Sequence, residues 1–245
     1  MLAFSDQIAV VTGASSGVGK AISLALAAKG ATLCLVGRQL ERLEAIAETV
    51  RAPADGLRVM SYQADLTVDR NVSELAATLG RDFGSIDVLV HSAGVISMGV
   101  PIESAPVEDL DWQYRTNVRG PYLLTQTLLP MLRKRRGQIV FINSLVGLNA
   151  KANSSQYSIT KHALKALADS LRDEVNPDGL RVLSVFLGRT ASPMQAMVHR
   201  TECRMYRPEL LVQPDDIASV VLNALSLSPT AEITDISIRH TIKSN

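Results

Sequence analysis

Short runs of apolar, β-branched residues alternate with longer segments of helical period along this chain. The runs are apolar on both faces, which is typical of strands in a parallel sheet that helices cover on both sides, with right-handed crossovers. The sequence therefore predicts an α/β fold: a Rossmann-type, doubly wound, mostly parallel seven-stranded sheet with helices on both faces. The predicted strands are Ile8–Thr12, Thr32–Val36, Arg58–Gln63, Val88–His91, Gln138–Asn143, Arg181–Leu187 and Asp235–Arg239.

A chain of 245 residues, 47% of them hydrophobic, can bury one large core. Because it has no Pro/Gly/Ser-rich linker and no internal repeat, we expect a single domain over residues 1–245. The formal net charge of +1 gives no electrostatic reason to expect binding to nucleic acid or to an anionic membrane. The basic run 133–136 follows a helix-like stretch, and cations at a helix C-terminus are a simpler interpretation than a binding patch.

The sequence also predicts a cytoplasmic protein. No apolar run approaches the length of a membrane span, and the first residues lack the basic and apolar segments of a signal peptide. The two cysteines, Cys34 in a predicted strand and Cys203 in a polar segment, make neither a disulfide framework nor a metal cluster. We therefore expect a reducing compartment and no bound metal.

A glycine-rich turn, TGASSGVG at 12–19, follows the first predicted strand and precedes a helix from about Val18 to Lys29. Gly13 permits a tight turn, and Gly17 and Gly19 let the backbone approach a diphosphate at the helix N-terminus. Three glycines alone are ordinary turn material. Between a first strand and a first helix, however, they favour nucleotide binding.

Gly37 and Arg38 stand at the end of the second strand, where an NAD-specific site usually offers a carboxylate to the adenosine ribose. A guanidinium at this place suits a 2′-phosphate instead, through charge-assisted hydrogen bonds. The sequence thus predicts NADP(H) in preference to NAD(H). The alternative is that Arg38 is a solvated residue at a helix start, paired with Glu41.

Polar or small residues also follow the later strands. Asp65 follows the third strand, where its carboxylate could accept from an adenine amine or cap a helix. Ala93 and Gly94 follow the fourth strand and would let the backbone lie against a ribose, and Ser144 follows the fifth. Because open α/β sheets bind ligands at the carboxyl ends of their strands, these residues point to one site.

Tyr157 and Lys161 lie four residues apart in a predicted helix and therefore share one face. A cation beside a phenol lowers the pKa of the phenol toward the range that acid-base chemistry uses. Such a pair also arises by chance. The other candidate residues are what favour a catalytic role for this one.

These motifs, in this order along nearly the whole chain, resemble those of the short-chain dehydrogenases/reductases. The resemblance implies an oxidoreductase that transfers a hydride between NADP(H) and a carbonyl or secondary alcohol of a small, partly apolar substrate. It also implies a homodimer or homotetramer. The matching parts are the TGxxxGxG run, Asp65, Ala93-Gly94, Asn117, Ser144 and the YxxxK motif from Tyr157 to Lys161.

The resemblance assigns roles to four catalytic residues. Tyr157 would be the general acid or base, and Ser144 would hydrogen-bond the substrate oxygen. Lys161 would bind the nicotinamide ribose and lower the pKa of Tyr157, and Asn117 would hold a water of a proton relay. The predicted cofactor contacts are Gly13, Ser15, Ser16, Gly17, Val18, Gly19, Arg38, Asp65, Leu66, Ala93, Gly94, Tyr157, Lys161, Gly188, Thr190 and Ser192.

The chain departs from the family pattern on the nicotinamide side. The usual NNAG reads HSAG from His91, the usual PG reads Leu187-Gly188, and Ser192 stands where a threonine would contact the carboxamide. We expect that His91 could contact the cofactor without a catalytic role. His162, beside the catalytic lysine, is expected to be a packing or surface residue.

The residues after the sixth strand form an expected irregular stretch that ends near Pro214, with a substrate lid at about 189–213. Arg204 and Arg207 in this stretch could meet an acidic group or face water. The apolar inner face of the lid is predicted from Met194, Met197, Met205, Tyr206 and Leu210.

Asn117 and Pro121 share a segment of helical period at about 106–135. Proline has no N–H for the carbonyl of Asn117, four residues earlier, so the helix could be kinked or bulged there and leave an acceptor for ordered water. Alternatively, the helix ends near Asn117 and restarts with Pro121 in its first turn.

Two other functions stay open at this point. One is a non-catalytic NADP(H)-sensing or regulatory protein on the same fold, which would need no proton donor such as Tyr157. The other is an epimerase or dehydratase, which the glycine spacing and the chain length fit less well.

Overall fold

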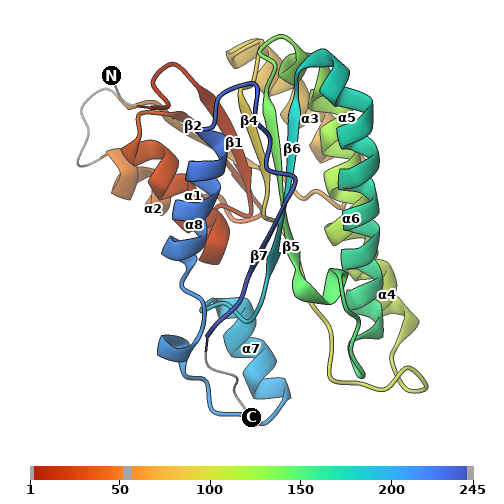
Figure 1. Ribbon diagram of the computed structural model, residues 1–245. Coiled ribbons are helices and arrows are strands. Elements are labelled where there is room, and N and C mark those ends of the chain that lie inside the picture. The colour runs from red at the N-terminus through yellow and green to blue at the C-terminus, as the bar shows by residue number, and fades with distance from the viewer. Residues whose placement is uncertain (1–2, 52–56, 242–245) are drawn as a thin grey trace.

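The computed structural model describes residues 3–51 and 57–241. In these residues seven strands form one parallel sheet in the order β3-β2-β1-β4-β5-β6-β7 (Figure 1). The predicted domain was 1–245, so its outermost residues and 52–56 lie outside the described part. The strands are β1 (Ile8–Thr12), β2 (Thr32–Gly37), β3 (Val59–Gln63), β4 (Val88–His91), β5 (Gln138–Ser144), β6 (Arg181–Leu187) and β7 (Asp235–Ile238).

Every predicted strand is present, and four boundaries differ by one residue, at β2, β3, β5 and β7. The prediction of a Rossmann-type fold is confirmed, with one refinement. All strand pairs are parallel, including the edge pair β6 and β7. The sheet was expected to be mostly parallel.

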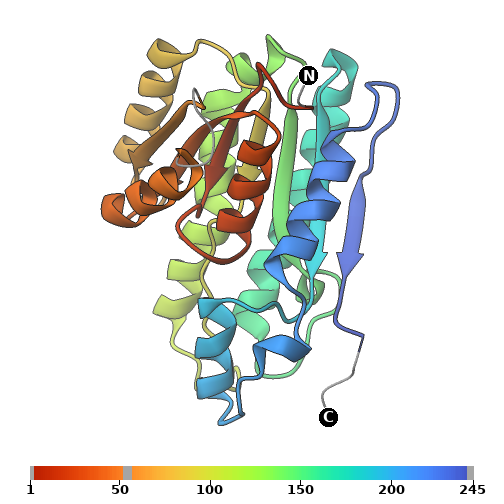
Figure 2. The same cartoon turned by 90° about the vertical axis from the view of Figure 1, so that its left-hand side faces the viewer.

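Helices cover both faces of the sheet. The layer that Figure 2 brings to the front holds α1 (Gly17–Ala28), α2 (Leu40–Arg51) and α8 (Pro214–Leu225). The opposite layer holds α3 (Asp69–Asp82), α5 (Gly120–Arg133) and α6 (Ser155–Val175). Strand residues alternate between the layers, as Val11 packs with the first and Val10 with the second.

The chain after β6 is not irregular, because α7 (Pro193–Thr201) forms there; Ser192 caps it by accepting from the Gln195 N–H at 3.2 Å. The remaining short elements are α4 (Val107–Tyr114), the π-helical turn η1 (Arg115–Arg119), and the 3₁₀ turns η2 (Leu145–Gly147), η3 (Asn176–Asp178) and η4 (Pro208–Leu210).

The helix that contains Asn117 is bulged, as the first of the two interpretations predicted. It continues from α4 through η1 into α5, and the Gly120 N–H donates to the Arg115 carbonyl, five residues back. Pro121 accounts for the bulge because it cannot donate to the Asn117 carbonyl.

Strands β1 and β4 are neighbours, although the chain leaves β1 toward β2 and β3 on the other side. The loops after β1 and β4 therefore diverge, and such a switch point opens a crevice at the carboxyl ends of the strands. Among the described residues no helix is long and apolar enough to cross a membrane.

Candidate active site

The glycine turn after β1 is shaped by close backbone contacts. Gly13 has a φ of +65°, and a Cβ there would lie 2.8 Å from the Cα of Ala93. A Cβ on Gly19 would lie 2.4 Å from the Gly13 carbonyl oxygen, so α1 also begins against this turn. Ser16 at the N-cap makes no side-chain cap bond to the first amides of α1. The turn therefore presents a helix N-terminus suited to an anion.

The hydroxyl of Thr12 ties the two diverging loops together. It accepts from the Ser92 N–H at 3.1 Å and the Ala93 N–H at 3.2 Å, and it donates to the Val90 carbonyl at 3.2 Å. Thr12 is buried. Sequence reasoning used it only as the first letter of a motif, although a polar residue that ends an apolar strand was a usable signal.

Arg38 follows β2 at the far end of the crevice. Its side chain is exposed, and its guanidinium forms no hydrogen bond or ion pair with any described residue, so the alternative pairing with Glu41 is absent there. Asp65 accepts from both the N–H and the hydroxyl of Thr67. Of the two alternatives for Asp65, the helix cap is wrong, because α3 begins at Asp69 after Val68.

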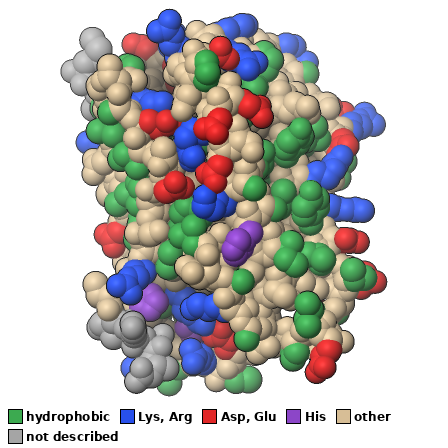
Figure 3. Space-filling model, turned by 45° about the vertical axis from the view of Figure 1, so that its right-hand side comes forward, with side chains coloured by type: hydrophobic (Ala, Val, Ile, Leu, Met, Phe, Trp, Pro, Cys, Tyr) green, Lys and Arg blue, Asp and Glu red, His purple; other side chains and the backbone are tan. Residues whose placement is uncertain are grey.

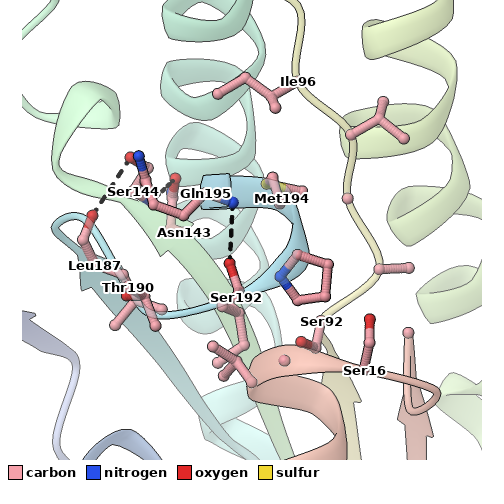
Figure 4. Close-up of a pocket in the computed structure, with 18 of the residues that line it drawn as sticks. Ser16, Ser92, Ile96, Asn143, Ser144, Leu187, Thr190, Ser192, Met194 and Gln195 are labelled. Carbon is pink, nitrogen blue, oxygen red and sulfur yellow. Dashed lines mark hydrogen bonds between the residues drawn. The ribbon is translucent and has the colours of Figure 1, made fainter. Parts of the chain in front are cut away.

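Ser144, Tyr157 and Lys161 converge at the centre of the crevice. Ser144 ends β5, whereas Tyr157 and Lys161 share one face of α6. The Ser144 hydroxyl donates to the Leu187 carbonyl at 3.4 Å, as Figure 4 shows, and Lys161 donates to the Ile142 carbonyl at 3.2 Å. The Lys161 ammonium lies 5.7 Å from the centre of the Tyr157 ring.

Burial dominates the protonation of both groups on α6. It raises the pKa of Tyr157 to about 12, and the hydrogen bond with Ser144 lowers this pKa only in part. Burial lowers the pKa of Lys161 to about 8. The prediction of a Tyr157 pKa shifted below its ordinary value is therefore wrong for this structure, because desolvation of the phenolate outweighs its neighbours.

Asn143 positions Ser144 and was missed by the sequence. It is buried; its side-chain oxygen accepts from the Ser144 N–H at 2.8 Å, and its amide donates to the Lys161 carbonyl at 3.1 Å. One side chain thus joins the end of β5 to the catalytic helix. Only a contact across 18 residues of sequence reveals this role.

Asn117 lies at the bulge, and its side chain connects three segments through hydrogen bonds. Its side-chain oxygen accepts from the Val95 N–H at 2.8 Å, and its amide donates to the Val95 carbonyl and to the Thr160 hydroxyl. The side chain is therefore fully used in holding the loop after β4 against α6. A relay water would have to meet the backbone carbonyl, which the bulge leaves without the usual helical donor.

The segment 189–213 is fixed at its base. Arg189 forms an ion pair with Glu202 at 2.6 Å, and its carbonyl accepts from the Val212 N–H at 3.1 Å. Thr190 lies buried in a bridge to Val212. Of the apolar residues expected on the inner face, Met194 lines the cavity, whereas Met197 and Met205 are exposed because they lie on the outer side of the segment.

Tyr206 and Leu210 also do not line the cavity: Tyr206 packs edge-on against His199, and Leu210 is exposed. His91 and His162 are away from the chemistry as well. His91 is buried against α5, where it contacts Thr125 at 2.8 Å and stacks on Phe141, so the expected contact with a cofactor is wrong. His162 is exposed, as predicted.

A cavity of about 830 Å³ joins these parts. Among the predicted site residues, Gly19 and Asn117 stand just outside the lining. Figure 4 shows Ser16 and Ser92 on one side, Ser144 and Thr190 on the other, and Ser192 between them. The predicted site residues that line it are Gly13, Ser15, Ser16, Gly17, Val18, Arg38, Asp65, Leu66, Ala93, Gly94, Ser144, Tyr157, Lys161, Gly188, Thr190 and Ser192.

Comparisons with known proteins agree with this geometry. A sequence profile described as short chain dehydrogenase matches residues 7–202. An uncharacterised oxidoreductase from Staphylococcus epidermidis is 33% identical over 240 residues, which cover 98% of this chain and 99% of the relative. An uncharacterised oxidoreductase from Staphylococcus aureus is 30% identical over the same shares of both chains.

Solved structures are similar over nearly the whole chain. An alcohol dehydrogenase from the archaeon Thermococcus sibiricus, complexed with 5-hydroxy-NADP, has a TM-score of 0.87 at 27% identity and 98% coverage of both chains. A metagenomic short-chain oxidoreductase in complex with NADP has a TM-score of 0.84 at 30% identity, covering 98% of this chain and 100% of its own.

Fold, site and sequence therefore define an oxidoreductase on a Rossmann-type sheet. The chain belongs to the short-chain dehydrogenase/reductase family and is an NAD(P)-dependent enzyme of that family.

Proposed function

We propose that this enzyme transfers a hydride between NADP(H) and a carbonyl or secondary alcohol of a small, partly apolar substrate. The observation that carries the proposal is the convergence of Ser144, Tyr157 and Lys161 on the cavity that begins at the glycine turn. A proton donor, a second hydroxyl and a cation beside a dinucleotide-shaped crevice are the groups that carbonyl reduction requires.

In the direction of reduction, NADPH held along this cavity would be the source of the hydride for the carbonyl carbon. The Tyr157 hydroxyl then gives its proton to the oxygen, which becomes the alcohol, and Ser144 holds that oxygen by a hydrogen bond. Lys161 would contact the nicotinamide ribose and stabilise the phenolate that remains. Asn117 would hold a relay water at its backbone carbonyl, so that proton supply from solvent restores the tyrosine.

We propose NADP(H) as the preferred cofactor because Arg38 lines the cavity with an unpaired guanidinium. A free cation at this end favours a 2′-phosphate, which NAD lacks. Two of the similar structures carry NADP or a derivative of it. The proposed contacts are the glycine-turn residues, Arg38, Asp65, Leu66, Ala93, Gly94, Tyr157, Lys161, Gly188, Thr190 and Ser192.

We also propose that 189–213 acts as a substrate lid on a single domain. Met194 and Gln195 of α7 line the cavity, while an ion pair holds the base of the segment in place.

A homodimer or homotetramer is supported by three exposed aromatic side chains on α4 and α5: Trp112, Tyr114 and Tyr122. The unpaired thiols of Cys34 and Cys203 agree with a reducing compartment and hence a cytoplasmic location.

The test is oxidation of NADPH, followed by its absorbance, with a panel of ketones and aldehydes. We expect turnover that Tyr157→Phe lowers by at least about a hundredfold, because general acid catalysis is lost. NADPH affinity, measured by fluorescence, should persist in this variant, whereas Lys161→Ala should weaken both. Binding of NADPH without turnover on any substrate would instead favour the sensing protein, and full activity of Tyr157→Phe would remove this tyrosine from the mechanism.

A further inference from the structure

We propose that the substrate carries a carboxylate, which Lys151 and Arg204 bind at the mouth of the cavity while its carbonyl or hydroxyl meets Tyr157. The inference rests on the proposed function of the same site and adds the substrate class. Two lining cations from separate segments of the chain would then set which carbonyl compounds the enzyme accepts.

The charge of the cavity lining is one-sided. Asp65 is the one acidic side chain among the described residues that line it, and Thr67 already engages that carboxylate at the end of β3. Several lining cations have other assignments. Arg38 and Lys161 are proposed to serve the cofactor, Arg189 is paired with Glu202, and Arg239 lies beside Gly188 on the cofactor side.

Lys151 belongs to the loop between η2 and α6. Its carbonyl accepts from the N–H and the hydroxyl of Ser154 at 3.3 and 2.8 Å, so the start of the catalytic helix fixes its backbone. Its side chain lines the cavity, and its ammonium forms no hydrogen bond or ion pair with a described residue. The main chain is therefore held while the cation stays available to an external anion.

Arg204 faces the cavity from the segment that follows α7. Its N–H donates to the His199 carbonyl at 2.8 Å, while its guanidinium is exposed and has no hydrogen-bond or ion-pair partner among the described residues. The carboxylate of Glu202, two residues away, already binds Arg189. Glu202 also interacts electrostatically with Arg204, but it forms no ion pair with that guanidinium, whose hydrogen-bond donors stay available. Figure 3 shows Lys, Arg and His side chains gathered at this end of the molecule.

Apolar side chains also line the cavity. Ile96 and Met98 come from the loop after β4, and Met194 and Val198 come from α7. Figure 4 shows Ile96 and Met194 reaching toward the same space from different elements. The combination suits an oxo acid or hydroxy acid: the apolar chain contacts the apolar wall, and the charged end contacts the two cations.

The experiment measures binding by calorimetry to the enzyme saturated with NADP⁺. The probes are a series of methyl-ketone carboxylic acids of increasing chain length, each matched by its methyl ester, which lacks the charge and is larger by one methyl group. We expect at least one acid to bind about tenfold tighter than its ester, and the ratio to shrink as salt is added, because the cations are exposed.

Two double variants make the test specific. Lys151→Met with Arg204→Met should bring the ratio of acid to ester affinity close to one. Lys29→Met with Arg200→Met removes the same charge from exposed side chains outside the cavity, and Arg200 lies on α7, so this control reproduces both the net charge and a change in the lid. It should keep the wild-type ratio. Lys151→Arg with Arg204→Lys should keep the preference as well.

Equal affinities of every acid and its ester in the wild type would overturn the inference, as would a preference that survives in the Lys151→Met, Arg204→Met variant. A variant that loses NADP⁺ affinity but keeps the preference would assign the two cations to the cofactor instead. Because the readout is binding, absence of turnover with all probes would contradict the proposed reaction without deciding the carboxylate site.

Discussion

Tyr157 and Lys161 are both buried, and burial moves their pKa values in opposite directions because it disfavours the charged form of each. At neutral pH the phenol is therefore protonated and ready to donate. The ammonium, in contrast, is held charged at a cost in folding stability, because no carboxylate among the described residues pairs with it.

That cost predicts the behaviour of Lys161→Met. The lysine has an ordinary pKa of 10.5 and a pKa of about 8 in the fold, so between these values only the unfolded chain keeps the proton. Wild-type stability should rise with pH across this window. Below pH 8 the variant should be more stable by about 1–3 kcal/mol.

Urea unfolding of both proteins without added cofactor, from pH 7 to above pH 10, measures this difference. The gap should narrow as pH rises, since the lysine becomes neutral in both states. A gap that stays constant with pH would mean that desolvation of Lys161 is not its source.

Arg38→Asp should reverse the cofactor preference. The wild type is expected to bind NADPH at least about tenfold tighter than NADH, because a free guanidinium gains charge-assisted hydrogen bonds to a 2′-phosphate. The aspartate would repel that phosphate and accept from a ribose 2′-hydroxyl. Fluorescence titration of both cofactors checks this, with Arg42→Asp as a charge control outside the cavity lining; equal affinities in the wild type would contradict it.

At this scale the sequence predicted the residues that form short motifs and missed those that act through distant contacts. Tyr157 and Lys161 were found because one helical turn brings them together. Thr12 and Asn143 were missed because their partners lie across the sheet or in another helix. The direction in which the pKa of Tyr157 shifts was also predicted wrongly, because a sequence shows the neighbouring charge but not how deeply the phenol is buried.

Among the elements, the bulge between α4 and α5 is the most constrained. Gly120, the first residue of α5, lies so close to Leu66 that an added Cβ would meet the Leu66 carbonyl oxygen at 2.9 Å. The bulged helix therefore rests directly on the end of the β3 loop, which lines the cavity. A side chain at this position would separate two parts of the site.

Gly120→Ala should consequently lower the free energy of unfolding by about 1–3 kcal/mol. The matched control is Gly80→Ala in α3, where a Cβ would meet only the Met131 sulfur at 3.9 Å. This substitution should raise stability by about 0.5–1 kcal/mol, because alanine favours the helix. Chemical denaturation of both variants tests the pair; equal effects would show that the contact with Leu66 is unimportant.

The strands could be predicted because their cause, an apolar run, is local. A missing N–H made the bulge one of two alternatives, and the sequence did not decide between them. The helix α7 could not be predicted. Its sequence lacks a strong apolar stripe, and it is held in place by Arg189, Glu202 and Val212, whose contacts form only after the chain has folded back. For the same reason, the prediction of which apolar residues of 189–213 face the cavity was only partly right.

For the whole molecule, the exposed aromatic residues of α4 and α5 predict self-association. Tyr122, with 52% of its surface exposed, stands on the layer that Figure 3 turns forward, where hydrophobic side chains gather. Tyr122→Glu should shift the sedimenting species to a smaller mass. Leu227→Glu, which changes an exposed apolar residue after α8 on the other layer, should not. A wild-type protein that sediments as a monomer would contradict the homo-oligomer.

The neighbouring positions of β1 and β4 have a consequence for the order in which the enzyme matures on the ribosome. The Thr12 hydroxyl can accept from the N–H groups of residues 92 and 93 only after these residues have left the ribosome. Tyr157 emerges later still. A growing chain therefore has the proposed cofactor contacts at the ends of β1 to β4 before it has Tyr157, Lys161 and the contacts that follow β6. We expect that cofactor binding and catalysis are both completed only when the last third of the chain has folded onto the first.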